Sequence, residues 1–421
     1  MINFTPNQII MIPVNDYIRH FEQLWNESPA DFPLFEKTYS LEEQKVREQN
    51  FSDFQQKING LKSKRKVEEL RKSDPSKTFF PVFKSFLKTV FDFEPEHLEI
   101  ILSDKFKNVS KDFFYQAREF GPELSPESIY QGLRNVWIMN GIQLMMGLPV
   151  EITPSIFGYS MIYPYSDNLL DDPTISAEEK KYFSIRFNRR LHGEIVLAQS
   201  RTELQLFKLV EMFERQYPRN EFPKVYESLY AIQHGQTQSL QLNGTTKISG
   251  SDIQTICFEK GGASVLADGY LVAGRLTPPE EQALFGYGVY LQLLDDIQDI
   301  KEDSEARTRT IFSCNPGLNL DELVNKTIHF GRKALEEMHC FKGDQIESFV
   351  KLMNRSIETM IIESVGMNEQ HYSYKYLAEL EKQSPIRFDF VRKKRSQSKS
   401  HRFSFFRKYF EEAKPESVIQ L

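Results

Sequence analysis

The feature that most constrains this chain is an acidic stretch within apolar surroundings, at residues 291–303. Asp295, Asp299 and Asp303 are four residues apart, so a helix places their carboxylates along one face. Asp296 lies about 100° around the helix from Asp295, still close to that face. Like charges at this spacing repel one another, so solvent, basic partners or divalent cations must offset the cost.

The sequence around these acids predicts one long and largely buried helix. Thr277 is an N-cap residue, and the two prolines and Glu280 that follow it complete a helix-start signal. Residues 283–299 contain no proline, and leucines and isoleucines flank the acids. Gly288 continues the acidic face, where it is expected to leave room for a ligand. This helix would offer an apolar interior end and an acidic mouth that suits Mg²⁺, which prefers oxygen ligands.

A second acidic stretch, at residues 167–172, repeats the pattern. Asp167 and Asp171 are again four residues apart, and Asp172 lies beside them. Pro173 then ends the predicted helix, because proline disfavours helical backbone in the residue before it. The chain between the two acidic stretches is long enough for several helices. Two acidic helix ends can therefore face each other across a cavity and hold a cluster of metal ions.

These stretches resemble the two aspartate-rich motifs of the class I isoprenoid synthases: the trans-prenyl diphosphate synthases, the squalene and phytoene synthases and the class I terpene cyclases. Residues 167–172 resemble the first motif in its D-x-x-x-D form. Residues 291–299 resemble the second motif of prenyl diphosphate synthases, in which a glutamine, here Gln292, precedes D-D-x-x-D. Residues 299–303 match the D-x-x-E-D that closes the second motif of squalene and phytoene synthases. The resemblance covers residues 155–310.

The resemblance also implies residues that bind diphosphate. Gln236, preceded by a glycine, and Lys260, followed by two glycines, look like the G-Q and K-T-G/A segments of prenyl synthases. Arg189 and Arg190 resemble the arginine pair that grips diphosphate after the first motif, and Arg307 resembles the basic residues after the second. Arginine suits this role because its planar fork is bidentate to phosphate.

The resemblance assigns these residues to three roles. The candidate catalytic residues are Asp167, Asp171, Asp295 and Asp299. The candidate substrate-binding residues are Arg189, Arg190, Gln236, Lys260, Gln292 and Arg307. The candidate metal ligands are Asp167, Asp171, Asp172, Asp295, Asp296, Asp299 and Asp303.

Helical periodicity and caps recur along the chain and predict an all-α protein. The resemblance implies an isoprenoid synthase helical bundle with a central cavity, extended by helices at the N-terminus. We expect residues 1–75 to form a charged helical accessory region, residues 76–385 the catalytic domain, and residues 386–421 a basic, aromatic C-terminal tail. The G-G-K-R segment with which prenyl diphosphate synthases bind the second diphosphate is missing, which disfavours simple chain elongation.

The implied function is that of a Mg²⁺-dependent enzyme, with three ions expected when substrate is bound. It would ionise an allylic prenyl diphosphate and couple the cation to a second prenyl chain, as in squalene, phytoene or polyprenyl synthases. A class I terpene cyclase is an alternative, in which the cation is captured by its own distal double bond. A non-catalytic prenyl-lipid-binding protein and a membrane-peripheral scaffold are further alternatives. The intact acids at both motifs argue against the loss of catalysis.

Composition limits the partners. The net charge of −6 argues against nucleic acid as the main partner. Three separated cysteines without metal-ligand spacing, and no apolar run of about 18 residues, predict a cytoplasmic location. The basic tail could rest on an anionic membrane surface, cover the active site or be disordered. A homodimer is left open.

Overall fold

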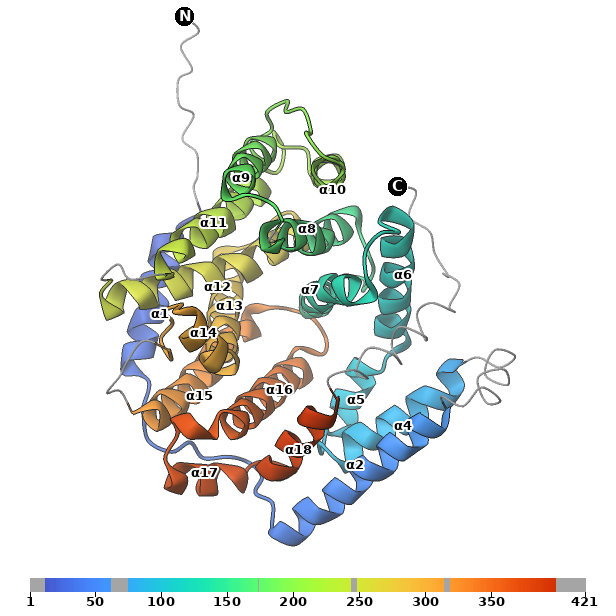
Figure 1. Ribbon diagram of the computed structural model, residues 1–421, viewed down its shortest axis with the longest axis vertical. Coiled ribbons are helices and arrows are strands. Elements are labelled where there is room, and N and C mark those ends of the chain that lie inside the picture. The colour runs from blue at the N-terminus through green and yellow to red at the C-terminus, as the bar shows by residue number, and fades with distance from the viewer. Residues whose placement is uncertain (1–11, 62–74, 173, 244–247, 314–318, 399–421) are drawn as a thin grey trace, which may run out of the picture.

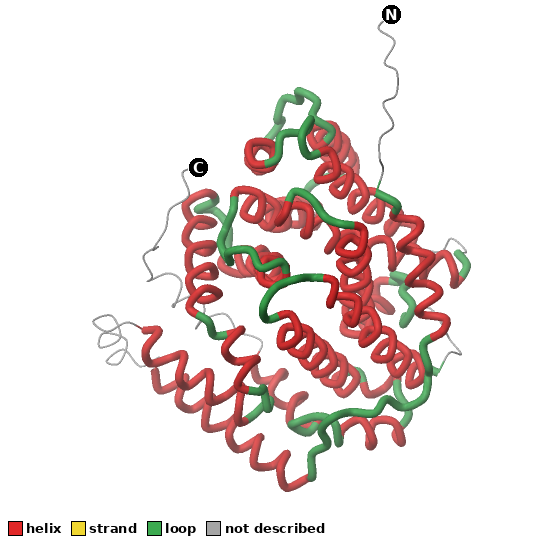
Figure 2. The backbone as a smooth tube through the Cα atoms, turned by 180° about the vertical axis from the view of Figure 1, so that it is seen from behind, coloured by secondary structure: helices red, strands yellow, loops and turns green. Residues whose placement is uncertain are grey.

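The computed structural model of the chain describes residues 12–61, 75–172, 174–243, 248–313 and 319–398. At residues 59–61, 75–79, 167–168, 170–171, 177 and 395–398 the description covers the backbone alone. The described parts consist of helices and the loops that join them (Figure 2), with one isolated β-bridge between Asn243 and Thr308 and no strand. The prediction of an all-α protein is confirmed.

The helices of the N-terminal half begin and end as follows: α1 (Val14–Glu27), α2 (Leu41–Leu61), α4 (Pro75–Thr89), α5 (Pro95–Ile101), α6 (Asp104–Phe120), α7 (Pro126–Met145), α8 (Pro154–Asp171), α9 (Ala177–Leu191) and α10 (Arg201–Gln216). Those of the C-terminal half are α11 (Pro223–Ser239), η1 (Leu240–Leu242), α12 (Gly250–Ala273), α13 (Pro278–Gln298), α14 (Ile300–Ala306), α15 (Leu320–Glu336), η2 (Glu337–Cys340), α16 (Ile346–Met367), η3 (Glu369–His371), α17 (Tyr374–Glu381) and α18 (Phe388–Ser398).

The central helices pack as a ring (Figure 1). Helix α7 contacts α8, α8 contacts α12, α12 contacts α13, α13 contacts α16, and α16 returns to α7. Other helices lie outside this ring: α10 against α8, α11 against α12, and α15 against α13 and α16. The acidic stretch at the end of α13 is therefore positioned by helices that are far apart in the sequence.

Helix α13 follows the sequence prediction closely. Its N-terminus is a capping box, in which the backbone N–H of Thr277 donates to Glu280 Oε2 at 2.8 Å. The helix ends at Gln298, and Asp299 lies at the junction with α14. The N–H of Asp299 still donates to the carbonyl of Asp295 at 2.9 Å, and the N–H of Asp303 to that of Asp299 at 2.8 Å. The row of acids therefore continues across the junction.

Glycines allow α12 and α13 to pack backbone against backbone. A Cβ atom added to Gly288 would lie 2.2 Å from the carbonyl oxygen of Gly261. A Cβ on Gly261 would lie 2.5 Å from the Cβ of Gln292. The expectation that Gly288 leaves room for a ligand is wrong, because the backbone of α12 occupies that space. These two glycines instead set the distance between the two helices.

Helix α1 belongs to the main core rather than to a separate accessory region. Tyr17, Ile18, Phe21 and Trp25 recur on one face of α1 and are buried against α12, α13 and α15. The Tyr17 hydroxyl also donates to the buried carboxylate of Glu281 at 2.6 Å. Part of the segment that the sequence assigned to a charged extension is thus a core helix, because its apolar face outweighs its charge content.

Helices α2 and α4 pack on each other and form, with α18, a small satellite at the edge of the molecule (Figure 1); α18 also packs on α16. Val90, Ile386 and Val391 are its buried centre, apart from the main core. Arg387 pairs with Glu48 on α2 at 2.6 Å, so segments near the two ends of the chain are joined. We call this unit the α2–α4–α18 satellite.

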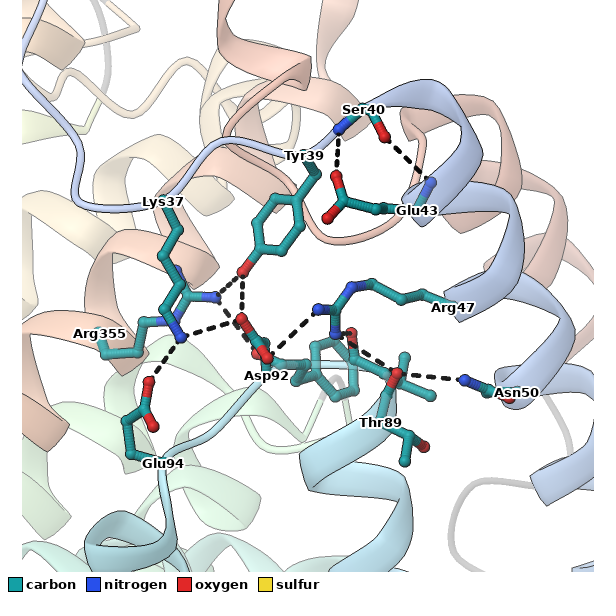
Figure 3. Close-up of polar contacts among 12 residues, drawn as sticks. Lys37, Tyr39, Ser40, Glu43, Arg47, Asn50, Thr89, Asp92, Glu94 and Arg355 are labelled. Carbon is teal, nitrogen blue, oxygen red and sulfur yellow. Dashed lines mark hydrogen bonds and ion pairs between the residues drawn. The ribbon is translucent and has the colours of Figure 1, made fainter.

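A polar cluster around Asp92 attaches the satellite to the bundle (Figure 3). Asp92 has a φ of 59°, in the left-handed region that few non-glycine residues occupy. Its carboxylate accepts hydrogen bonds from Lys37 at 2.9 Å and from Tyr39 at 3.2 Å, and pairs with Arg47 at 3.2 Å. Arg355 of α16 donates to the Tyr39 hydroxyl at 2.7 Å. The turn before α5, the segment before α2 and helix α16 are held together at this point.

The glycine contact gives a direct test of the α12–α13 packing. Gly288→Ala forces the two backbones apart, and we expect it to lower the free energy of unfolding by about 1–3 kcal/mol or more, the usual cost of overpacking. The measurement is urea unfolding followed by circular dichroism. The matched control is Gly250→Ala at the start of α12, where an added Cβ meets nothing within 4 Å. Equal stability of the two variants would contradict the packing described here.

Candidate acidic pocket at the end of helix α13

A pocket of about 270 Å³ lies where the ends of α11 and α13 meet α12, α14 and the loop after α14. It brings together six residues that the sequence predicted for metal or substrate binding. These are Lys260, Gln292, Asp295, Asp296, Asp299 and Asp303. The rest of the lining consists of Ser239, Leu242, Asn243, Cys257, Thr308 and Thr310.

The close contact of α12 and α13 explains why these residues share one pocket. Lys260 directly precedes Gly261, and Gln292 lies one helical turn after Gly288, so both flank the point of closest approach. Lys260 therefore lies near the acids of the next helix, where its positive charge opposes their mutual repulsion. The mouth is held by the β-bridge between Asn243 and Thr308, whose side chains share a hydrogen bond of 3.0 Å.

Asp296 is the most perturbed acid of the pocket. Only 2% of it is exposed, and this burial raises the pKa of its carboxyl group to about 7. Gln292 opposes the shift by donating to Asp296 Oδ1 at 2.8 Å, whereas the charge of Asp295 increases it. Its second oxygen, Oδ2, is buried and has no hydrogen-bond partner among the described residues. A buried carboxylate oxygen without a partner is costly, so a proton or a cation would stabilise it.

The acids at the pocket mouth repel one another as well. Burial and the charges of Asp299 and Asp295 raise the pKa of Asp303 to about 6. The pKa of Asp299 is raised by burial and by Asp295, while Arg134 and Lys260 counteract this shift. Asp296, Asp299 and Asp303 thus favour the protonated form more than isolated acids do. The electrostatics are those of a site that favours positive charge.

This set of donors fits a hard divalent cation that is shared with a ligand. Carboxylate oxygens are the protein ligands that Mg²⁺ prefers, and Mg²⁺ usually keeps several waters and bridges to substrate phosphates. Among the described residues, no three or more His, Cys, Asp or Glu side chains are placed so that they could hold a metal ion by themselves. Water and substrate oxygens would have to complete the coordination.

The first acidic stretch ends α8, as the sequence predicted. Helix α8 runs to Asp171, and Pro173 follows its C-cap residue Asp172. The side chains of Asp167 and Asp171 lie outside the described residues, so their position relative to α13 stays a prediction. Asp172 does not line the acidic pocket. Its carboxylate accepts hydrogen bonds from the backbone and hydroxyl of Thr174, which lower its pKa, and it lines another cavity of about 790 Å³.

The predicted arginine pair also lies away from the acidic pocket. Arg189 donates to Glu194 at 2.7 Å, and Arg190 makes two hydrogen bonds to Glu214 at 2.8 and 2.5 Å. Both guanidinium groups are thus paired with carboxylates of their own neighbourhood. Arg190 and Glu214, together with Arg219, connect the end of α9 to α10. Neither arginine lines the acidic pocket, and their role in binding diphosphate stays a prediction.

Two other predicted residues lie near the pocket without lining it. Gln236 is exposed on α11, one residue after Gly235, whose close approach to the backbone of Lys260 packs α11 onto α12. Arg307 is exposed at the C-terminus of α14, where it has a φ of 59°. It directly precedes Thr308, which does line the pocket.

Sequence reasoning missed Arg134 and Cys257. Arg134 is an exposed residue of α7, and its charge acts on Asp299 across the ring. A lone arginine on a helix more than a hundred residues from the acids carries no local signal, and only the fold reveals it. Cys257 lines the pocket one turn before Lys260, and burial raises its pKa well above the ordinary value, so it stays a thiol.

The raised pKa values predict an unusual dependence of stability on pH. In the folded protein Asp303 and Asp296 ionise at about 6 and about 7, whereas in the unfolded chain aspartates ionise near 3.9. Between these values the folded state binds more protons, so the free energy of unfolding falls as pH rises through this window. We expect the melting temperature in chelator to fall across it, and Mg²⁺ to restore stability on the alkaline side.

The comparison that isolates these two groups is a double variant, Asp296→Asn with Asp303→Asn. Its melting temperature should depend less on pH over the same window, because neither amide titrates. If the wild type and the double variant show parallel pH profiles, the two carboxyl groups do not have raised pKa values.

No protein-family description and no curated protein matches this chain. One solved structure that resembles it is the crystal structure of geranylgeranyl pyrophosphate synthetase from Pyrococcus horikoshii Ot3. The identity is 12%, the overlap covers 69% of this chain and 98% of that chain, and the TM-score is 0.32. At this TM-score the overlap does not establish a common fold.

Proposed function

We propose that this chain is a Mg²⁺-dependent class I isoprenoid synthase that ionises an allylic prenyl diphosphate and couples the resulting cation to a second prenyl chain. The observation that carries the proposal is the pocket in which Asp295, Asp296, Asp299 and Asp303 gather beside Lys260. The proposal adds Asp167 and Asp171 of the first acidic stretch, whose helix α8 belongs to the same ring as α13.

The pocket residues divide the work of binding. Asp295, Asp299 and Asp303 present carboxylate oxygens at the mouth, while Gln292 fixes the orientation of the buried Asp296. Bound Mg²⁺ supplies positive charge that stabilises the departing diphosphate. Lys260 contributes a further positive charge from α12. The carboxylates that Lys260 does not neutralise still repel one another and repel a free anion. The pocket therefore favours a diphosphate that is bound to Mg²⁺ over a free diphosphate.

Arg134 extends the positive charge to the far side of the ring. It lies on α7, opposite the acids of α13, and is close enough to lower the pKa of Asp299. In the proposed reaction the carbon–oxygen bond of the allylic diphosphate breaks, and its electron pair leaves with the diphosphate. In this proposal Lys260, which lines the pocket, and Arg134 hold the released anion, since preorganised charges stabilise a developing charge without reorganisation.

The first experiment is incubation with geranyl, farnesyl and geranylgeranyl diphosphates, with and without Mg²⁺. Diphosphate release and the organic products are both followed. We expect release only with Mg²⁺, and we expect Asp299→Asn to abolish it, as Asp171→Asn should. Glu305→Gln is the matched control, because Glu305 is an exposed acid of α14 that does not line the pocket. Full turnover by Asp299→Asn would falsify the metal assignment.

A second experiment separates the residues of the pocket from the arginine pair. Lys260→Gln and Arg134→Gln should each weaken transition-state stabilisation by about 1.5–3 kcal/mol, the range for hydrogen bonds to charged groups. This corresponds to a loss of roughly ten- to a hundredfold in kcat/KM. Arg189→Gln should have little effect, because Arg189 is paired with Glu194 away from the pocket. The opposite ranking would favour the arginine pair as the diphosphate site.

The same assay distinguishes the proposed enzyme from a non-catalytic prenyl-lipid-binding protein. Such a protein would bind the substrates without releasing diphosphate in any condition. A coupled product would be distinguished from a cyclised one by its carbon number, because only coupling joins two prenyl chains.

A further inference from the structure

The α2–α4–α18 satellite has a surface that the proposed reaction does not use. Phe51, Phe54, Phe83, Phe86 and Phe390 contact one another there, and each ring remains partly exposed. The centroids of Phe54 and Phe86 are 4.0 Å apart in a stacked arrangement, and Phe51 touches both Phe86 and Phe390. We call these five rings the aromatic face.

Two of the three helices that form the aromatic face, α4 and α18, carry an excess of basic residues, whereas α2 has four acidic and three basic residues. Helix α4 contains three lysines and no acidic residue, and its Lys84 and Lys88 are exposed. Helix α18 contains two arginines and two lysines against Asp389. Lys394 of α18 lies over the rings of Phe51 and Phe390, at 5.8 and 5.3 Å from their centroids.

The sequence continues this charge on both sides of the satellite. Residues 62–74, which connect α2 to α4, contain six basic and three acidic residues. Residues 401–410 interleave basic and aromatic residues, and residues 411–421 contain three glutamates and one lysine. By sequence alone, the residues next to α4 and α18 therefore add further basic side chains.

We propose that the aromatic face and its basic rim form a docking surface for an anionic lipid membrane. Apolar rings flanked by lysines are the composition of segments that lie in the membrane interface, where rings enter the acyl boundary and lysines meet acidic headgroups. The five rings are clustered and each keeps part of its surface exposed, whereas binding of single-stranded nucleic acid uses separate stacking platforms. None of the described helices combines the length and apolar content needed to cross a bilayer.

This surface makes the membrane contact a property of the folded satellite and not of the C-terminal tail alone. The inference rests on the proposed function only for the reason why membrane contact would be useful. Prenyl diphosphates are amphiphiles, and an enzyme docked on a membrane would meet them there. The evidence for the surface itself is the partial exposure of the rings and the positive charge of α4 and α18.

The test uses co-sedimentation of the full chain with vesicles of phosphatidylcholine, with or without phosphatidylserine. The variant Lys84→Gln/Lys88→Gln removes two exposed lysines of α4. Each lysine near an anionic surface is worth about 1 kcal/mol, so binding to phosphatidylserine vesicles should weaken about thirtyfold. The matched control, Lys181→Gln/Lys208→Gln, removes two exposed lysines from α9 and α10, at the opposite end of the molecule (Figure 1), and should bind as the wild type does.

Several outcomes would overturn the inference. Absence of binding to phosphatidylserine vesicles, or an equal loss in both double variants, would remove the satellite as the docking surface. Binding to a single-stranded RNA oligonucleotide that depends on Lys84 and Lys88, without vesicle binding, would assign the surface to nucleic acid. Circular dichroism of each variant verifies that the satellite remains folded.

Diphosphate release from geranyl diphosphate without vesicles separates this inference from the proposed function. The Lys84→Gln/Lys88→Gln variant should release diphosphate at the wild-type rate, because neither lysine lies at the acidic pocket. Suppose that neither the wild type nor the variants release diphosphate, but that loss of Lys84 and Lys88 still weakens vesicle binding. The proposed reaction is then wrong, and the docking surface is still supported.

Discussion

The backbone contact between α12 and α13 is the constraint on which the rest of this structure depends. Gly261 and Gly288 allow the two helices to approach until main-chain atoms touch. Lys260 and Gln292 flank this point and are thereby brought to the acids. Helix α11 packs on the outside of α12, while α1, α15 and α16 pack on α13. A wider spacing of the central pair would move the lysine away from the carboxylates and shift four other helices.

The acidic pocket is maintained against its own electrostatics. Asp296 is buried beside Asp295, and Gln292 donates a hydrogen bond to its carboxylate. The apolar packing of α13, whose leucines and isoleucines are buried, holds the carboxylates where they would not gather by themselves. The free energy gained by apolar packing thus offsets the repulsion between the carboxylates. Such an arrangement is typical of binding sites with perturbed pKa values.

Local sequence signals were sufficient to predict where helices begin and end, but not which residues of other helices each side chain contacts. The cap at Thr277, the four-residue spacing of the acids and the stop at Pro173 predicted α13, the acidic row and the end of α8, because each depends on residues nearby in the chain. The prediction of a ligand beside Gly288 was wrong, because a glycine indicates a close approach but does not reveal that the approaching group is the backbone of α12. The pairing of Arg190 could not be anticipated for a similar reason, since Glu214, which accepts its hydrogen bonds, lies on another helix.

The same limit explains what was missed in the rest of the chain. The charge of Arg134 acts on Asp299 only because the fold packs α7 against α12, the neighbour of α13. The core role of α1 depends on apolar positions such as Phe21 and Trp25, which the dense charge of the following segment concealed. The membership of the six pocket residues in one site could be anticipated, because the resemblance to a known pair of motifs carries long-range information that periodicity does not.

The pairing of Glu48 with Arg387 has a consequence for how the molecule is made. Helices α2 and α4 emerge from the ribosome early, but the side of their hairpin that receives α18 stays empty until nearly the whole chain has been synthesised. During that interval Val90 lacks Ile386 and Val391, with which it is buried in the finished fold, and chaperones recognise such exposed apolar surface. A nascent chain that stops before Ile386 would leave this small core incomplete, so the end of the chain completes the packing of a segment near its beginning.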